Sequence, residues 1–117
     1  MKFTKNKAFK FKKVGIEGWV YLNKKQSPGA GVALIESEKG HETIIKSKRN
    51  AWIYYVISGK GKFVIDGEKI ACKEEELIFV PKNTPFYYKG KLKMLLLTVP
   101  AWEEKHEVTL GRVDNSD

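Results

Sequence analysis

The side chains best suited to bind a ligand are Lys46, Lys48 and Trp52, which follow one another between Gly40 and Gly59. Each lysine carries a positive charge that can hold a carboxylate or a phosphate. The indole of Trp52 offers an apolar ring face for stacking. Together, these residue types favour a site that binds a small anionic molecule containing a ring.

Two aromatic pairs extend this candidate site. Tyr54 lies two residues beyond Trp52, and Tyr88 lies two residues beyond Phe86, so in extended strands each pair points to one face of a sheet. Buried tyrosine hydroxyls and indole N–H groups need hydrogen-bond partners. We therefore predict that both pairs and the two lysines bind the ligand. Whether the rings line a pocket or fill the interior stays open at this point.

The spacing of these residues resembles the two sequence motifs of the cupin superfamily. The segment G-HETII-K-S-K-RNA-W-IYYVIS-G keeps both glycines of the first motif at the expected distances, and PKNTPF (81–86) matches the frame of the second. The resemblance covers roughly Gly31 to Trp102. It implies a small jelly-roll barrel, commonly a homodimer, with its pocket at one mouth of the barrel. Because cupins have many activities, the function must be argued from the site itself.

The resemblance also identifies the positions at which many cupins hold a metal ion. The residues there are Lys46, Lys48, Trp52 and Phe86. None of them can coordinate a metal as the usual imidazole and carboxylate ligands do. We therefore predict no metal and no cofactor. Other possible donors lie off the motif positions, and these are His41, Glu42 and His106.

Alternating apolar and polar residues between frequent turn signals predict an all-β fold, a single-domain cupin jelly-roll β-barrel of antiparallel strands. Asp66-Gly67 is the strongest hairpin signal, and Gly59-Lys60-Gly61 predicts a second tight turn. Trp102 to His106 predicts one short helical turn before a final extended segment.

The length of 117 residues predicts one domain, 1–117, with a basic N-terminal arm (1–13) and a core (31–102) that carries both motif frames. The net charge of +8 favours anionic partners without choosing among them. No apolar run is long enough for a signal peptide or a membrane span, so we expect a cytoplasmic protein without a membrane partner. Cys72 has no disulfide partner and is expected to pack as a small apolar residue.

Three functions remain open, and with them the question of whether the chain is an enzyme. The first is a metal-free protein that binds a sugar, sugar acid or sugar phosphate among the aromatic rings and lysines. The second is a metal-independent sugar isomerase, epimerase or lyase, with Tyr54 or Tyr88 as acid and a lysine as base. The third is a basic β-barrel that binds single-stranded nucleic acid. We disfavour the third because an oligonucleotide-binding fold would not need both motif frames.

A homodimer is compatible with every cupin interpretation. Ile53, Tyr55 and Ile57 alternate with the inward residues of their strand, and so predict an apolar outer face that packs against a partner. The segment KMLLLTVP (93–100) is apolar on both faces, which predicts a strand covered on both sides.

Overall fold

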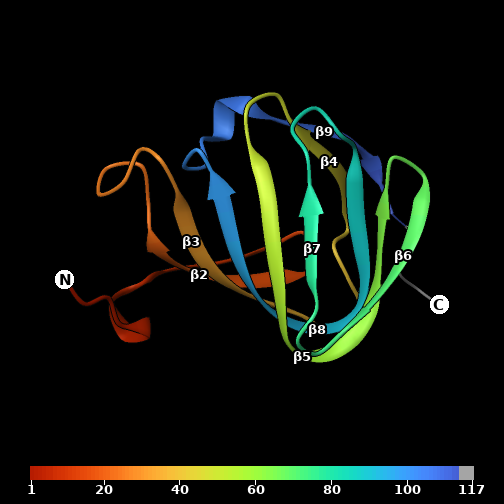
Figure 1. Ribbon diagram of the computed structural model, residues 1–117, viewed down its shortest axis with the longest axis horizontal. Helices are drawn as coiled ribbons and strands as arrows, with labels where there is room; N and C mark the ends of the chain where they lie inside the picture. Colours follow the sequence, from red (N-terminus) through yellow and green to blue (C-terminus); the bar gives the residue numbers. More distant parts are fainter. Residues whose placement is uncertain (114–117) are drawn as a thin grey trace.

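The computed structural model describes residues 1–113 as antiparallel strands that curl into a barrel (Figure 1). The strands are β1 (Phe9–Lys13), β2 (Ile16–Leu22), β3 (Gly31–Ser37), β4 (Thr43–Ser47), β5 (Ala51–Ile65), β6 (Glu68–Lys73), β7 (Leu77–Val80), β8 (Phe86–Val99) and β9 (Glu107–Arg112). Two 3₁₀ turns, η1 (Lys5–Lys7) and η2 (Glu104–His106), are the only helical elements of the described chain. The predicted all-β jelly-roll barrel is confirmed.

Two long strands, β5 and β8, build both walls of the barrel. One strand path runs β1-β2-β3-β8-β4-β9, and β5 pairs with β6, β7 and β8. Residues 52–55 of β5 pair with β7 on one wall, and residues 60–65 pair with β6 on the other. Both strands curve at the base of the barrel (Figure 1). Side chains that alternate inward along them therefore meet across the interior.

The predicted turn at Gly59-Lys60-Gly61 is wrong, because β5 runs through these residues without reversing. The glycines instead allow the two long strands to approach closely where they bend. A Cβ atom on Gly61 would lie 2.1 Å from the carbonyl oxygen of Lys89 on β8, and Gly59 has a φ of +92°. Glycine therefore serves here for close backbone contact and bending, not for chain reversal.

Two other local predictions are confirmed. Asp66 (φ 49°) and Gly67 (φ 83°) form a two-residue turn, and Ile65 pairs with Glu68. Positive φ at both central residues is typical of a type I′ hairpin. The expected helical turn in the 102–106 segment is η2, and β9 follows it directly.

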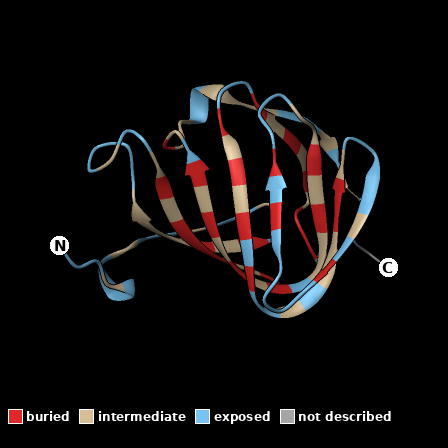
Figure 2. Cartoon of the chain, viewed as in Figure 1, coloured by how far each residue is buried: buried red, intermediate tan, exposed pale blue. Residues whose placement is uncertain are grey.

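Buried residues alternate with less buried ones along several strands (Figure 2), as expected where one face of each strand points into the barrel. Phe63, Tyr88, Val56 and Met94 are fully buried in the barrel core. Cys72 is also buried, and this burial raises the pKa of its thiol. The basic arm is partly built into the sheet, because β1 pairs with β2 over residues 9–13. No helix in residues 1–113 is long and apolar enough to cross a membrane.

Candidate functional site

The four predicted aromatic residues meet in the middle of the barrel. Trp52 lies edge-on to Phe86, with ring centroids 5.3 Å apart, and Tyr54 lies 5.6 Å from Tyr88 and 6.0 Å from Phe86. Phe63, from the opposite wall, lies 5.0 Å from both tyrosine rings. None of the five side chains is more than 4% exposed. The rings therefore pack on one another and fill this part of the interior.

Lys46 and Lys48 lie outside this cluster, in contrast to the expectation that they point inward. The buried residues of β4 are Thr43, Ile45 and Ser47, whereas Lys46 is half-buried between two of them and Lys48 is exposed beyond the strand. Alternation along the strand places Lys46 on the opposite face from Ile45. A buried ammonium group without a partner would be costly, which favours this register.

The inward face of β4 continues backwards to His41, which is 6% exposed. Its ring lies edge-on to that of Tyr88, with centroids 5.5 Å apart. Nδ1 lies 2.8 Å from the carbonyl oxygen of Thr43, which can only accept, so Nδ1 carries the hydrogen. The lone pair of the neutral ring is then on Nε2.

Burial is the main reason that the pKa of His41 lies below 6.5, and the positive charge of Lys13 lowers it further. The hydrogen bond to Thr43 and the charge of Glu42 act in the opposite direction but are weaker overall. His41 is therefore neutral at pH 7. A neutral imidazole in an apolar interior can accept a proton.

The tyrosines have the opposite chemistry. Burial raises the pKa of Tyr54 well above 10, with smaller contributions from Tyr88 and Glu107, and burial likewise raises that of Tyr88. Both hydroxyls thus stay protonated and can donate. Among the described residues, the Tyr88 hydroxyl and the Trp52 Nε1 are buried without a hydrogen-bond partner. Each such atom costs about 1–3 kcal/mol, which a polar ligand would recover.

A second group of side chains lies outside the aromatic cluster. Trp102 donates from Nε1 to the Glu107 carboxylate at 3.0 Å, and the Lys13 ammonium lies 5.4 Å from the Trp102 ring centroid. The charge of Glu107 contributes to the raised pKa of Tyr54, and the charge of Lys13 contributes to the lowered pKa of His41. These contacts connect the inner aromatic residues to a partly exposed, charged rim.

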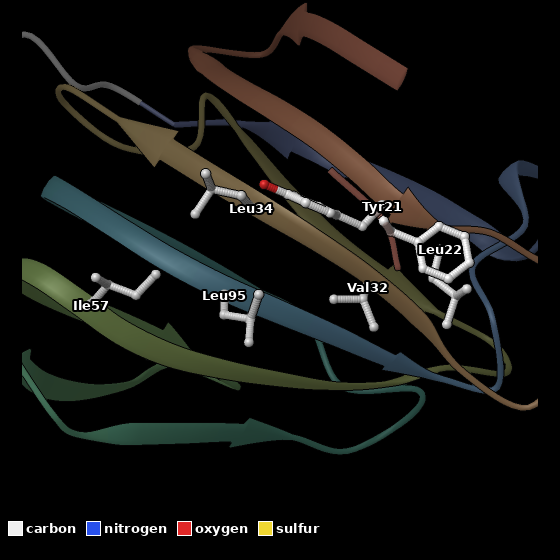
Figure 3. Close-up of a pocket in the computed structure, with 7 residues that line it drawn as sticks. Tyr21, Leu22, Val32, Leu34, Ile57 and Leu95 are labelled. Carbon is white, nitrogen blue, oxygen red and sulfur yellow. The ribbon is translucent and has the colours of Figure 1, made fainter. Parts of the chain in front are cut away.

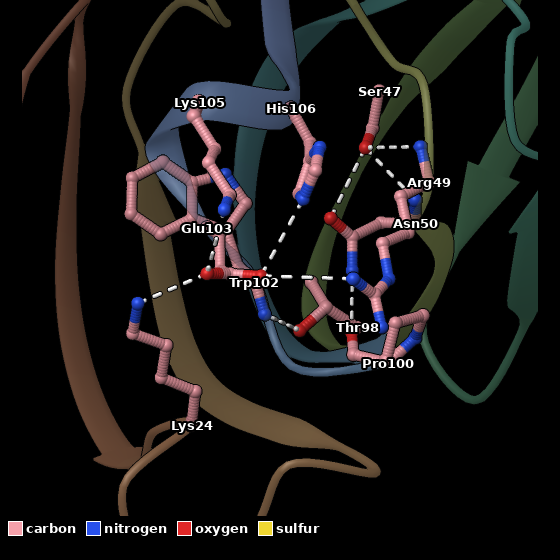
Figure 4. Close-up of polar contacts among 10 residues, drawn as sticks. All are labelled: Lys24, Ser47, Arg49, Asn50, Thr98, Pro100, Trp102, Glu103, Lys105 and His106. Carbon is pink, nitrogen blue, oxygen red and sulfur yellow. Dashed lines mark hydrogen bonds and ion pairs between the residues drawn. The ribbon is translucent and has the colours of Figure 1, made fainter.

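Ion pairs centred on Glu103 hold the segment that carries Trp102 in place (Figure 4). The Glu103 carboxylate lies 2.9 Å from the Lys24 ammonium, 3.4 Å from His106 Nε2 and 3.9 Å from Arg49. The hydrogen bond from Lys24 is the main reason that the pKa of Glu103 is lowered. The backbone N–H of Trp102 also donates to Thr98 Oγ1 at 3.1 Å. The segment that carries Trp102 is thus fixed on both sides of the indole.

A cavity of about 380 Å³ lies elsewhere, on the outer face of the sheet (Figure 3). It is lined by Phe3, Tyr21, Leu22, Val32, Leu34, Ile57 and Leu95. These side chains come from the arm, β2, β3, β5 and β8 and are almost entirely apolar. The cavity is therefore separate from the aromatic cluster and its polar atoms.

The side chains at the motif positions do not fit a metal ion. Trp52 and Phe86 offer no donor atom, and Lys46 and Lys48 are turned away from the interior. Within residues 1–113, no group of three or more His, Cys, Asp or Glu side chains is placed to hold a metal.

Sequence reasoning brought together four of the residues but missed His41 as their neighbour. Its signal was the alternation His41, Thr43, Ile45, Ser47, which requires the inward face of β4 to be shifted by one residue from the motif positions. Local spacing does not predict that Lys13, Trp102 and Glu107 lie near the cluster, because they come from distant segments of the chain.

Known structures share this architecture. Streptomyces Pac13, a nucleoside dehydratase, has been solved with uridine as a Tyr-to-Phe variant; its TM-score is 0.94 at 32% identity, over 100% of this chain and 95% of Pac13. KdgF from Halomonas has a TM-score of 0.74 at 16% identity, over 88% of this chain and 96% of KdgF, which shows the fold alone.

Sequence comparisons agree with the fold. An uncharacterised protein from Methanocaldococcus jannaschii is 28% identical over 95 residues, which cover 77% of this chain and 71% of that protein. The model of the cupin domain matches residues 33–100, which span both motif frames and strands β3 to β8. The chain therefore belongs to the cupin family.

Proposed function

We propose that this cupin is a metal-independent lyase that binds a nucleoside or a closely related ribose compound and removes water from it. The observation that carries the proposal is the trio His41, Tyr54 and Tyr88, whose intervals along the chain are 13 and 34 residues. Variants of Pac13 solved with uridine replace one histidine and two tyrosines, and these follow one another at the same intervals of 13 and 34 residues.

The protonation states of the trio suit an elimination reaction. His41 takes a proton from a ligand carbon, the electron pair of that C–H bond forms a C=C bond, and the neighbouring C–O bond breaks. A tyrosine hydroxyl, Tyr54 or Tyr88, gives its proton to the departing hydroxide, which leaves as water. Solvent exchange then returns the proton from His41 to the tyrosine. The pKa shifts support these roles, because burial keeps the imidazole neutral and the phenols protonated.

The chemistry also limits the substrate. A neutral imidazole removes a proton from a ribose carbon only when an adjacent carbonyl stabilises the resulting carbanion. The expected substrates are therefore nucleosides in which one ribose carbon has been oxidised to an aldehyde or ketone. Uridine itself should bind without reacting, which makes it a probe for the site.

Two measurements test the proposal. Titration with uridine, followed by calorimetry and tryptophan fluorescence, should give saturable binding. Mass spectrometry should then detect the loss of one water from uridine derivatives that carry a ribose aldehyde or ketone. His41→Gln should abolish this loss, with His106→Gln as the matched control. If no uridine binds at millimolar concentration, the nucleoside assignment is wrong.

Binding without turnover would support the first function considered from the sequence, a protein that binds a sugar-containing ligand without chemistry. Uridine would still bind, His41→Gln would still weaken it, and no derivative would lose water. The ribose ring would then meet the aromatic residues much as expected for a carbohydrate. The third function assumed a barrel of another fold. The chain is a cupin, and Trp52, Tyr54 and Phe63 are too buried to stack on bases of a single strand, so we disfavour single-stranded nucleic acid as the ligand.

We also propose that the outer sheet face forms a homodimer interface. Residues paired in register form two rows across β7, β5, β8 and β3. The first row is Phe79, Ile53, Leu97 and Val32, and the second is Leu77, Tyr55, Leu95 and Leu34. All eight side chains are apolar or aromatic. Leu77 and Phe79 are 58% and 54% exposed, respectively. An apolar sheet face of this kind suits packing against the same face of a second copy.

A further inference from the structure

Lys13 holds an unusual place among the basic residues of the arm. It ends β1, two residues after Phe11, so both side chains point to the same face of the strand. The Phe11 ring packs over Gly18 of β2, where a Cβ atom would lie 2.3 Å from the ring, and Phe11 contacts the barrel core. Lys13 therefore shares the face of β1 that packs on the barrel, and its side chain is exposed at the end of the strand.

The turn after β1 places Lys13 close to the segment that carries His41. The backbone N–H of Glu42, the residue next to His41, donates to the carbonyl oxygen of Val14 at 2.8 Å. The Lys13 ammonium lies 5.4 Å from the Trp102 ring centroid and 5.7 Å from that of Phe11. The charge therefore lies beside two aromatic rings, and Val14, the next residue, contacts the segment that carries His41.

Three other lysines in this part of the molecule have carboxylate partners among residues 1–113, whereas Lys2, Lys7 and Lys12 have none. Lys5 pairs with Glu36 at 3.9 Å, Lys10 with Glu17 at 3.4 Å and Lys24 with Glu103 at 2.9 Å. Within residues 1–113, no carboxylate lies within ion-pair distance of the Lys13 ammonium. Aromatic ring faces stabilise a cation by about 0.5–2 kcal/mol but leave its charge uncompensated. The ammonium is therefore available to an anionic group of a ligand.

We propose that Lys13 recognises an anionic substituent on the ligand, a phosphate or a carboxylate, so that the site prefers a nucleotide or an acidic nucleoside over a neutral one. This inference rests on the proposed function, because it uses the same site. Two observations support it: the cation at the rim without a carboxylate partner, and the buried Tyr88 hydroxyl without a hydrogen-bond partner. A lysine suits this role because its ammonium is a compact charge on a flexible stem.

Binding of such an anion would also act on the catalytic base. The charge of Lys13 lowers the pKa of His41, and an anion beside the ammonium would cancel part of that effect. The other charged group that acts on His41 is Glu42, which raises its pKa. An anionic ligand would therefore make His41 a stronger base than a neutral ligand would.

The test compares uridine, uridine 5′-monophosphate and uridine 5′-carboxylate by calorimetry at constant ionic strength. The variant is Lys13→Gln, and the matched control is Lys10→Gln. Lys10 lies on the same strand, and its ammonium is 5.4 Å from the Trp19 ring centroid, so both variants lose one positive charge that lies beside aromatic rings. Lys10→Gln also loses the ion pair with Glu17. The two anionic probes separate phosphate from carboxylate recognition.

We expect the wild type to bind at least one anionic probe about tenfold or more tightly than uridine, as a charge-assisted contact would provide. In Lys13→Gln the anionic probes should bind no more tightly than uridine, while Lys10→Gln should keep the preference. Saturable uridine binding without any preference for the anions would overturn this inference alone. An equal effect of both variants would also overturn it, as a consequence of net charge. Failure of all three probes would overturn the proposed function as well.

Discussion

The ring of His41 lies edge-on to the ring of Tyr88, with centroids 5.5 Å apart and an interplanar angle of 68°. The backbone holds this relationship, because the N–H of His41 donates to the carbonyl oxygen of Tyr88 at 2.9 Å. A proton acceptor and a proton donor are thereby placed together by main-chain pairing. Such a pair needs little rearrangement before it acts on a ligand that contacts both side chains.

The pKa of His41 should respond to Lys13. We expect Lys13→Gln to raise it towards the ordinary value of 6.5, because the variant removes a positive charge that disfavours the imidazolium. NMR titration of the histidine ring protons measures this change, and the His106 signals provide an internal control. An unchanged or lower His41 pKa would show that the ammonium does not act on this ring.

Protonation of His41 should also destabilise the fold in mild acid. Its pKa is lower in the folded chain than in the unfolded chain, so the unfolded chain binds more protons between the two values. The free energy of unfolding should therefore fall as the pH drops from about 6.5 to the folded pKa, and this contribution should be constant above 6.5. Urea unfolding at several pH values should show a shallower fall for His41→Gln than for the wild type.

Tyr88→Phe should separate ligand binding from stability. The variant removes a buried hydroxyl that has no partner among the described residues, so the free energy of unfolding should stay the same or rise by about 1 kcal/mol. Uridine affinity should fall about tenfold, because a ligand hydrogen bond is lost. Tyr87→Phe, on the neighbouring half-buried residue, is the control and should change neither quantity. A clear loss of stability in Tyr88→Phe would mean that the hydroxyl is satisfied in the folded protein.

Gly61→Ala should be strongly destabilising. A methyl group there would lie 2.1 Å from the carbonyl oxygen of Lys89, so the paired backbones of β5 and β8 would have to separate. We expect a loss of at least about 2 kcal/mol in the free energy of unfolding. Gly111→Ala on β9, where nothing lies within 4 Å, should change stability by no more than about 0.5 kcal/mol. Equal Tm values for the two variants would contradict the close strand contact.

Phe79→Lys tests the proposed dimer. Phe79 is 54% exposed on the outer sheet face, and a lysine there would place two like charges in a symmetric interface. Light scattering after gel filtration should detect a dimer for the wild type and a monomer for the variant. Leu110→Lys, at a 50% exposed residue of β9, should leave the dimer intact. A monomeric wild type at all concentrations would end the proposal.

Local sequence patterns were sufficient for the strand content, the Asp66-Gly67 hairpin and the four aromatic residues Trp52, Tyr54, Phe86 and Tyr88 of the cluster. Each follows from alternation or from turn chemistry, which depend on neighbours along the chain. The two motif frames also predicted the family, because their spacing reflects the order of strands and bends in the barrel.

The tertiary structure decided which face of β4 points inward, and so replaced Lys46 with His41 beside the tyrosines. A shift of one residue moves every side chain of a strand to the other face, and local spacing does not select between the two registers. Folding also brought Lys13 and Trp102 together from nearly opposite ends of the chain. Contacts of this kind depend on long-range strand pairing, which a single sequence does not encode as a local pattern.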